Sequence, residues 1–261
     1  MKFRKIQGDL RRKLLKLYKD ANAGHIGSSL SCIDLLIALF HVKSASERVI
    51  LSKGHAAAAL YIMLNSTGEL NDDVLQTFYK NGTKLPAHPA ANTFTNIPFG
   101  LGSLGHGLPI ACGIATGNKL LQNDDYIYVL MSDGETNEGT SWEAAHYAVA
   151  KKLDNLIVVI DKNNLQGIGY TKDILGDTSD ANKWRSIGFD VIESDGHYIE
   201  SLVDCINHSK NKNEKPKLII ANTVKGKGVD YMEDKMEWHY LPMTEEQYYI
   251  ALQSLEKNYY A

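Results

Sequence analysis

Two aliphatic runs, 126–131 and 156–160, most constrain what this chain can fold into. The first reads Tyr-Ile-Tyr-Val-Leu-Met and the second Leu-Ile-Val-Val-Ile, and a segment with helical character, 138–151, separates them. Near-continuous apolar strands that alternate with helices are typical of a parallel sheet whose two faces are covered by helices. The sequence therefore predicts an α/β fold with helices on both faces of the sheet.

The rest of the chain follows the same plan. Apolar residues at helical spacing from Ile6 to Leu17 predict a first helix that ends near 22–24, and Ser31 is expected to cap a second helix. That second helix is expected over 32–40. Further helices are expected over 55–65, 108–121, 198–209 and 244–255, and further strands over 48–52, 189–193 and 218–221. No internal repeat or linker divides the chain, so we expect residues 1–261 to form a single domain.

The segment 82–107 is predicted to be a long loop, because it holds three of the six prolines and several glycines. Loops of this length in compact domains are usually functional or disordered. Residues 100–105 match the pattern G-x-G-x-x-G, but a dinucleotide-binding turn needs a strand before it, and 88–99 has none. We therefore reject a nicotinamide-dinucleotide site.

Composition excludes several classes of partner. The 261 residues include 28 Lys and Arg against 31 Asp and Glu, a net charge of −3 that gives no electrostatic basis for binding nucleic acid. No apolar run is long enough to span a membrane, and the N-terminus lacks the apolar core of a signal peptide. Three widely spaced cysteines without a CxxC pair suit a reduced compartment, so a cytoplasmic location is expected.

Polar residues that follow the two aliphatic runs form the first candidate site. Asp133 and Gly134 follow the first run, and Asn163 follows the second. Because parallel strands end at the same edge of a sheet, these side chains can converge there. Carboxylate and amide oxygens suit Mg²⁺ or Ca²⁺, and bound Mg²⁺ often completes its shell with a phosphate, which the backbone of Gly134 would let approach. The alternative is that the two segments are only a turn and a polar loop.

An Asp-Gly pair at a strand end, followed thirty residues later by Asn, is similar to the motif that binds thiamine diphosphate (ThDP). The flanking segments resemble the amino-terminal half of transketolase, in order, from about residue 10 to 245. They are Gly24-His25, Ser52-Lys53-Gly54-His55, Gly102-Ser103-Leu104-Gly105, Asp133-Gly134-Glu135, Glu138-Gly139, Trp142-Glu143-Ala144, Leu153-Asp154-Asn155-Leu156 and Thr223-Val224-Lys225-Gly226-Lys227-Gly228. The resemblance implies the ThDP-binding (pyrophosphate-domain) fold. It also implies transfer of a two-carbon ketol unit from a ketose, or ketose phosphate, to an aldose.

The resemblance also implies roles for individual residues. The implied metal ligands for Mg²⁺, with Ca²⁺ or Mn²⁺ as alternatives, are Asp133, Asn163 and the backbone carbonyl of Leu165. The implied cofactor-binding residues are Ser28, His55, Gly102, Ser103, Leu104, Gly134, Asn163, Lys225 and His239. The implied catalytic residues are His25, His239 and His88, which would bind sugar hydroxyls and move protons, work that suits a pKa near neutrality. The alternatives are a solvated loop lysine for Lys225 and a plain helix-start residue for His55.

Transketolases bind ThDP between two domains, of which this chain resembles one. The resemblance therefore implies a split transketolase whose pyrimidine-binding and C-terminal domains are on a separate chain. That partner would carry the glutamate that activates ThDP, and an α₂β₂ assembly is expected. The alternatives are a split two-carbon transferase for a specialised sugar, an enzyme similar to deoxyxylulose-phosphate synthase, or an inactive scaffold subunit. Tyr240 follows His239 where relatives often have glycine, which puts the shape of the substrate channel in question.

Overall fold

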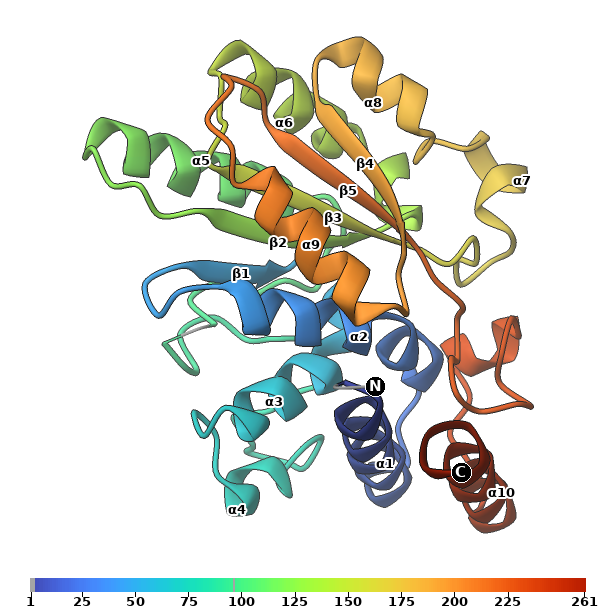
Figure 1. The fold of residues 1–261 in the computed structure, drawn as a ribbon. Helices are drawn as coiled ribbons and strands as arrows, with labels where there is room; N and C mark the ends of the chain where they lie inside the picture. Colours follow the sequence, from blue (N-terminus) through green and yellow to red (C-terminus); the bar gives the residue numbers. More distant parts are fainter. Residues whose placement is uncertain (1–2, 96) are drawn as a thin grey trace.

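A five-stranded parallel sheet forms the centre of the computed structural model (Figure 1). The structure describes residues 3–95 and 97–261. Residues 1–2 of the predicted domain and residue 96 of the predicted long loop lie outside the described part. The strands are β1 (Arg48–Leu51), β2 (Ile127–Ser132), β3 (Leu156–Lys162), β4 (Asp190–Asp195) and β5 (Lys217–Asn222). All four pairings are parallel and the order is β1-β2-β3-β5-β4, which confirms the predicted α/β sheet.

Helices cover both faces of this sheet, as the sequence predicted. One face packs against α5 (Gly107–Leu120), α6 (Gly139–Ala150) and α8 (Ala181–Ile187), and the other against α2 (Ile26–Val42) and α9 (Ile199–Ser209). The chain crosses the sheet in one direction from β1 to β4 and then turns back once to β5. Because crossovers between parallel strands are right-handed, this single reversal places α9 on the opposite face from α5, α6 and α8.

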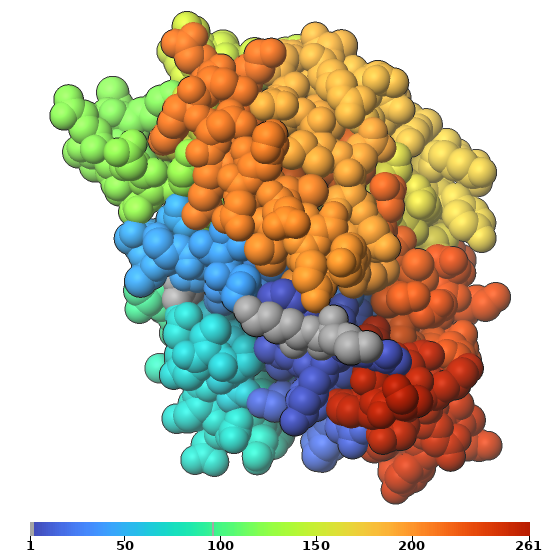
Figure 2. Space-filling model, in the orientation of Figure 1, coloured from blue at the N-terminus to red at the C-terminus, as the bar shows by residue number. Residues whose placement is uncertain are grey.

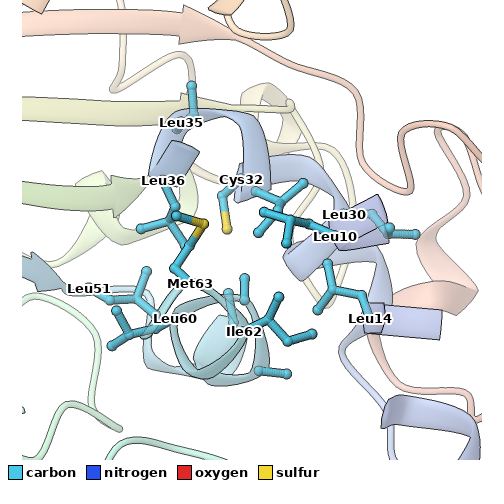
Figure 3. Close-up of a cluster of buried hydrophobic side chains, with 14 of the residues drawn as sticks. Leu10, Leu14, Leu30, Cys32, Leu35, Leu36, Leu51, Leu60, Ile62 and Met63 are labelled. Carbon is cyan, nitrogen blue, oxygen red and sulfur yellow. The ribbon is translucent and has the colours of Figure 1, made fainter. Parts of the chain in front are cut away.

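A further helical layer packs against α2. α1 (Arg4–Ala21) and α3 (Ala57–Ser66) form this layer, and α10 (Glu245–Leu255) packs against α1. Figure 3 shows leucine side chains of α1 and α2 meeting those of α3 in one buried cluster. Residues 256–260 form a π-helical turn after α10, and Figure 2 shows this end of the chain lying against α1. This last turn and α1 therefore lie side by side.

Ser31 does not cap a helix, which corrects the prediction. Helix α2 already begins at Ile26, and Ser31 is a fully buried residue in its interior. Two physical reasons explain the error. The segment from Gly27 to Ser29 is small and polar, which is typical of a loop, and a helix buried on nearly every side lacks the amphipathic period by which helices are recognised.

Three other short helices were not predicted: α4 (Asp72–Leu75), α7 (Thr171–Leu175) and α8. Each has seven residues or fewer, too short to display a hydrophobic period. The described part of 82–106 has no helix or strand of its own, as expected for the long loop, apart from an isolated bridge between Phe94 and Ile97. No helix in the described residues is long and apolar enough to cross a membrane.

Candidate active site

Asp133 lies at the carboxyl end of β2 and joins it to the segment that follows β3. Its Oδ2 accepts hydrogen bonds from the backbone N–H of Asn164 (2.6 Å) and the hydroxyl of Thr171 (3.0 Å), and its Oδ1 accepts one from the Gly134 N–H (2.8 Å). The side chain is buried, and burial together with the nearby charge of Asp161 raises the pKa of this carboxyl. A positive charge beside Asp133 would therefore stabilise its ionised form.

Asn163 and Leu165 lie next to this carboxylate at the end of β3. The Asn163 Oδ1 accepts from the Leu165 N–H at 3.0 Å, and the Leu165 carbonyl accepts from the Lys225 ammonium at 3.0 Å. The structure thus brings together a carboxylate, a side-chain amide and a main-chain carbonyl. In the described part of the chain, no cluster of three His, Cys, Asp or Glu side chains could hold a metal. The oxygen donors at the β2 and β3 ends fit Mg²⁺ or Ca²⁺ rather than zinc.

At Gly134, beside these oxygens, the backbone lies close to the side chain of Gln166. A Cβ added at Gly134 would lie 2.9 Å from Cγ of Gln166, so any larger residue would push against that side chain. The Gln166 Nε2 is a buried donor with no hydrogen-bond partner in the described residues. An anionic group bound here would supply an acceptor, which fits the diphosphate contact that the sequence implied for Gly134.

Four histidines from distant parts of the chain meet in one cluster beside this edge. The ring centroid of His25 is 5.3 Å from that of His239, 5.7 Å from His55 and 5.8 Å from His88. The rings of His55 and His239 stack at 5.4 Å, and the His25 N–H donates to the His239 carbonyl at 3.1 Å. His25 holds a left-handed backbone conformation, with φ of 74°. The structure therefore brings together all three residues predicted as catalytic.

Burial lowers the pKa of every histidine in this cluster, because desolvation disfavours the charged ring. The pKa of His25 falls to about 4 and that of His239 to about 3, with smaller contributions from nearby positive groups. The pKa values of His55 and His88 also fall. This differs from the pKa near neutrality that the sequence suggested. At neutral pH the four rings are uncharged and act as hydrogen-bond donors and acceptors.

Lys225 links the histidines to the oxygen donors. Its buried ammonium contacts the Leu165 carbonyl and also lies 2.8 Å from Nδ1 of His239. Burial and the charge of Lys53 lower the pKa of Lys225 to about 8. The interpretation of Lys225 as a solvated loop lysine is therefore wrong.

The remaining predicted cofactor residues lie around this centre. Gly102 packs against His88, whose Cβ is 3.8 Å from the place where a Cβ of Gly102 would be. Ser103 is exposed, and the Leu104 carbonyl contacts His106 rather than the cluster. Ser28 is buried, and its carbonyl accepts from the Lys53 ammonium at 3.2 Å. Gly102 and Ser28 thus reach the centre, whereas Ser103 and Leu104 lie at its rim.

Sequence reasoning missed a group of buried charges beneath the site. The Lys53 ammonium forms an ion pair with the Asp161 carboxylate, and both side chains are fully buried. Glu135 is also buried, and it accepts from the Gly105 N–H at 2.8 Å and from the Ser52 hydroxyl. Ser52, Lys53 and Glu135 stand within segments that carry the family resemblance, but no local pattern predicts that their side chains are buried together.

Comparison with known proteins identifies the family. The family model described as "Transketolase, thiamine diphosphate binding domain" matches residues 8–258. The chain belongs to the transketolase family. It is 38% identical over 258 residues to one of the subunits of the apulose-4-phosphate transketolase of Actinobacillus succinogenes, covering 95% of this chain and 93% of that protein. It is 36% identical over 262 residues to the 6-deoxy-6-sulfo-D-fructose transketolase subunit SqwG of Clostridium sp., covering 96% and 95%.

Solved transketolases share the fold. The transketolase from Campylobacter jejuni superposes with a TM-score of 0.89 at 31% identity, over 98% of this chain but 43% of that one. Human transketolase is 35% identical over 240 residues, which cover 85% of this chain and 37% of the human protein. The chain thus spans less than half of these transketolases and nearly all of the two subunits. Its domain is the one that binds ThDP in a family whose reaction is transfer of a two-carbon ketol unit.

Proposed function

We propose that this chain is the ThDP- and Mg²⁺-binding subunit of a split transketolase that moves a two-carbon ketol unit from a ketose or ketose phosphate to an aldose. The observation that carries the proposal is the meeting of two groups at one edge of the sheet. The oxygen donors of Asp133, Asn163 and Leu165 lie beside the histidine cluster, and Lys225 contacts both. Asp133, Asn163 and Leu165 would hold the cation, and Gly134 would face the diphosphate.

When bound, ThDP supplies the electron sink for cleavage of a carbon–carbon bond in the donor. The chain's own residues bind and orient the sugar. Because the Lys225 ammonium can donate to Nδ1 of His239, the neutral ring of His239 carries its hydrogen on Nε2. That hydrogen is then available to a sugar oxygen. His25 is close to His239, and His88 is close to His25. Both neutral rings would bind neighbouring hydroxyls and pass protons between them.

The partner is proposed to be a second chain that carries the pyrimidine-binding and C-terminal domains. Residues 1–261 would form one domain, and two copies of each chain would assemble as α₂β₂. The two relatives named as subunits match this chain over almost their whole length. Large apolar side chains are also exposed beside the site: Ile168 is 75% exposed, Leu175 62% and Tyr170 53%. An apolar surface of this kind usually marks an interface.

The unpaired cysteines Cys32, Cys112 and Cys205 support a cytoplasmic location.

One experiment separates this enzyme from an inactive scaffold protein. The chain is purified with its partner, the bound cofactor is released, and thiochrome fluorescence measures the ThDP content. A coupled assay then follows ketol transfer from a ketose phosphate. Stoichiometric ThDP with turnover supports the proposal, whereas a complex that holds no ThDP after loading with the cofactor and Mg²⁺ would contradict it.

Replacing His239 should separate catalysis from cofactor binding. In His239→Ala we expect the ThDP affinity to stay within about tenfold, or about 1.4 kcal/mol. We expect kcat/KM for ketol transfer to fall by about 10²–10⁴, because a positioned acid–base group is lost. Calorimetry and steady-state kinetics measure the two effects. The matched control is His146→Ala on the exposed side of α6, and an unchanged rate in His239→Ala would contradict the assigned role.

Tyr240 should control which sugars reach the histidines. Its ring centroid is 4.6 Å from that of His239 and 6.0 Å from that of His25, and a Cβ added at Gly167 would overlap its hydroxyl. The Tyr240 side chain therefore packs along one side of the histidine cluster, although it is 58% exposed. In Tyr240→Gly we expect the ratio of kcat/KM for a large over a small acceptor to rise by about tenfold or more. Tyr240→Phe keeps the ring and should keep the ratio; equal ratios in both variants would exclude this role.

A further inference from the structure

Ser31 lies in the interior of α2, with its side chain directed at the strand ends that form the candidate metal site. The side chain is fully buried, yet its hydroxyl reaches polar groups from two strands. It donates to Oδ1 of Asp161 at 2.7 Å, it lies 3.1 Å from Nδ2 of Asn163, and it lies 3.2 Å from the Thr223 hydroxyl. The residue that the sequence suggested as a helix cap is therefore part of a buried polar network under the site.

The chemistry of this network fixes the direction of each hydrogen bond. Asp161 pairs with the Lys53 ammonium, and a carboxylate in such an ion pair accepts hydrogen bonds and donates none. Asp161 at 2.7 Å is the nearer of the two acceptors beside the Ser31 hydroxyl, so the single hydrogen of Ser31 goes to Asp161. The serine oxygen must then accept from Asn163. Only the NH₂ group of the Asn163 amide can donate, so that group faces Ser31.

The same constraint decides where the Asn163 oxygen points. With its NH₂ group held by Ser31, Oδ1 faces the other way, toward the N–H of Leu165. Without these two partners an asparagine amide could turn by 180°, because its two ends have nearly the same shape. A turned amide would present hydrogens to a cation instead of an oxygen, and would bind none.

We propose that Ser31 is a positioning residue that holds the side-chain oxygen of Asn163 toward the divalent cation. This inference rests on the proposed role of Asn163 as a metal ligand. Residues that orient a ligand without touching the metal typically contribute a factor of about 10–100 to metal affinity.

Mn²⁺ binding tests the proposal directly. The full chain, purified with its partner and supplied with ThDP, is titrated with Mn²⁺ while electron paramagnetic resonance measures the free ion. In Ser31→Ala we expect the apparent Kd for Mn²⁺ to rise about tenfold or more. The matched control is Ser29→Ala, which removes an equally buried hydroxyl from the same helix, one that bonds to the Tyr18 hydroxyl at 2.7 Å. Ser29→Ala should change the Kd by less than about twofold, since its hydroxyl does not reach the site.

Saturating metal gives a second readout. ThDP affinity measured by calorimetry should fall in Ser31→Ala at low Mn²⁺ and return to the wild-type value at high Mn²⁺. A general loss of packing in α2 would not be reversed by the ion. Equal weakening of Mn²⁺ binding in Ser29→Ala and Ser31→Ala would therefore overturn the proposal.

Asn163→Ala separates this inference from the metal site itself. If Asn163→Ala binds Mn²⁺ as tightly as the wild type, the proposed ligand is wrong. If Asn163→Ala loses affinity but Ser31→Ala keeps it, the metal site stands and the role of Ser31 is overturned. If Ser31→Ala does not fold, Ser31→Cys takes its place in the Mn²⁺ titration. A thiol has a similar size to the hydroxyl but is a weak acceptor, so the same rise in Kd is expected.

Discussion

The chain purified without its partner should bind ThDP weakly and show no sustained ketol transfer, and co-expression with the partner should restore both. Activation of ThDP in the family needs a carboxylate beside the pyrimidine ring. The buried carboxylates near the site are already engaged: Asp133 accepts three hydrogen bonds, Asp161 pairs with Lys53, and Glu135 accepts from Ser52 and Gly105. None of these three is free to serve the pyrimidine ring, so we assign that carboxylate to the partner.

A coupled assay on the chain, freed of partner and of host transketolase, measures this effect. We expect activity at background level for the chain alone and turnover on the order of 1–10³ s⁻¹ for the complex, the usual range for enzymes. The control is the complex assayed after removal and re-addition of ThDP. The exposed side chains Ile168 and Leu175 give a further check, because charged substitutions there should weaken assembly while leaving the fold intact. Sustained turnover by the chain alone would place the activating carboxylate within this sequence and contradict the split architecture.

The sequence predicted the sheet well because its central strands are buried on both faces. β2 and β3 show continuous apolar character, and both are fully buried apart from the last residue of β3. The same property hid the start of α2. A helix buried on nearly every side has no polar face, so its boundary depended on local signals, and Ser31 gave a misleading one.

Some residues of the candidate site could be predicted from the sequence and others could not. Asp133 and Asn163 could be found because each follows a strand directly, and the ends of adjacent parallel strands must meet. The Lys53–Asp161 pair joins residues 108 positions apart, and no local pattern connects them. The lowered pKa values of the histidines could not be predicted from the sequence either, because they arise from burial among segments that only the folded chain brings together.

Removing the charge of Asp133 should abolish ThDP-dependent activity while leaving the domain folded. Asp133→Asn keeps the shape of the side chain but takes away the only carboxylate among the three proposed ligands. We expect ThDP affinity in the presence of Mg²⁺ to fall at least about a hundredfold, or about 2.7 kcal/mol, and ketol transfer to fall to background. Calorimetry of ThDP binding with Mg²⁺ and with EDTA measures the first effect, and the coupled assay measures the second.

Asp133→Asn should lose its activity without losing its thermal stability, and this difference makes the test specific for a metal ligand. Burial and the charge of Asp161 raise the pKa of Asp133, so its ionised form costs free energy in the metal-free chain. Asp133→Asn removes that cost, but it replaces one carboxylate oxygen by an NH₂ group. The hydrogen bond from the N–H of either Gly134 or Asn164 is then lost. Since these effects oppose each other, we expect the Tm of the metal-free chain to change by only a few degrees. A large fall in Tm would make Asp133 a structural residue, and full ThDP affinity in Asp133→Asn, or binding by the wild type that ignores EDTA, would exclude it as a metal ligand.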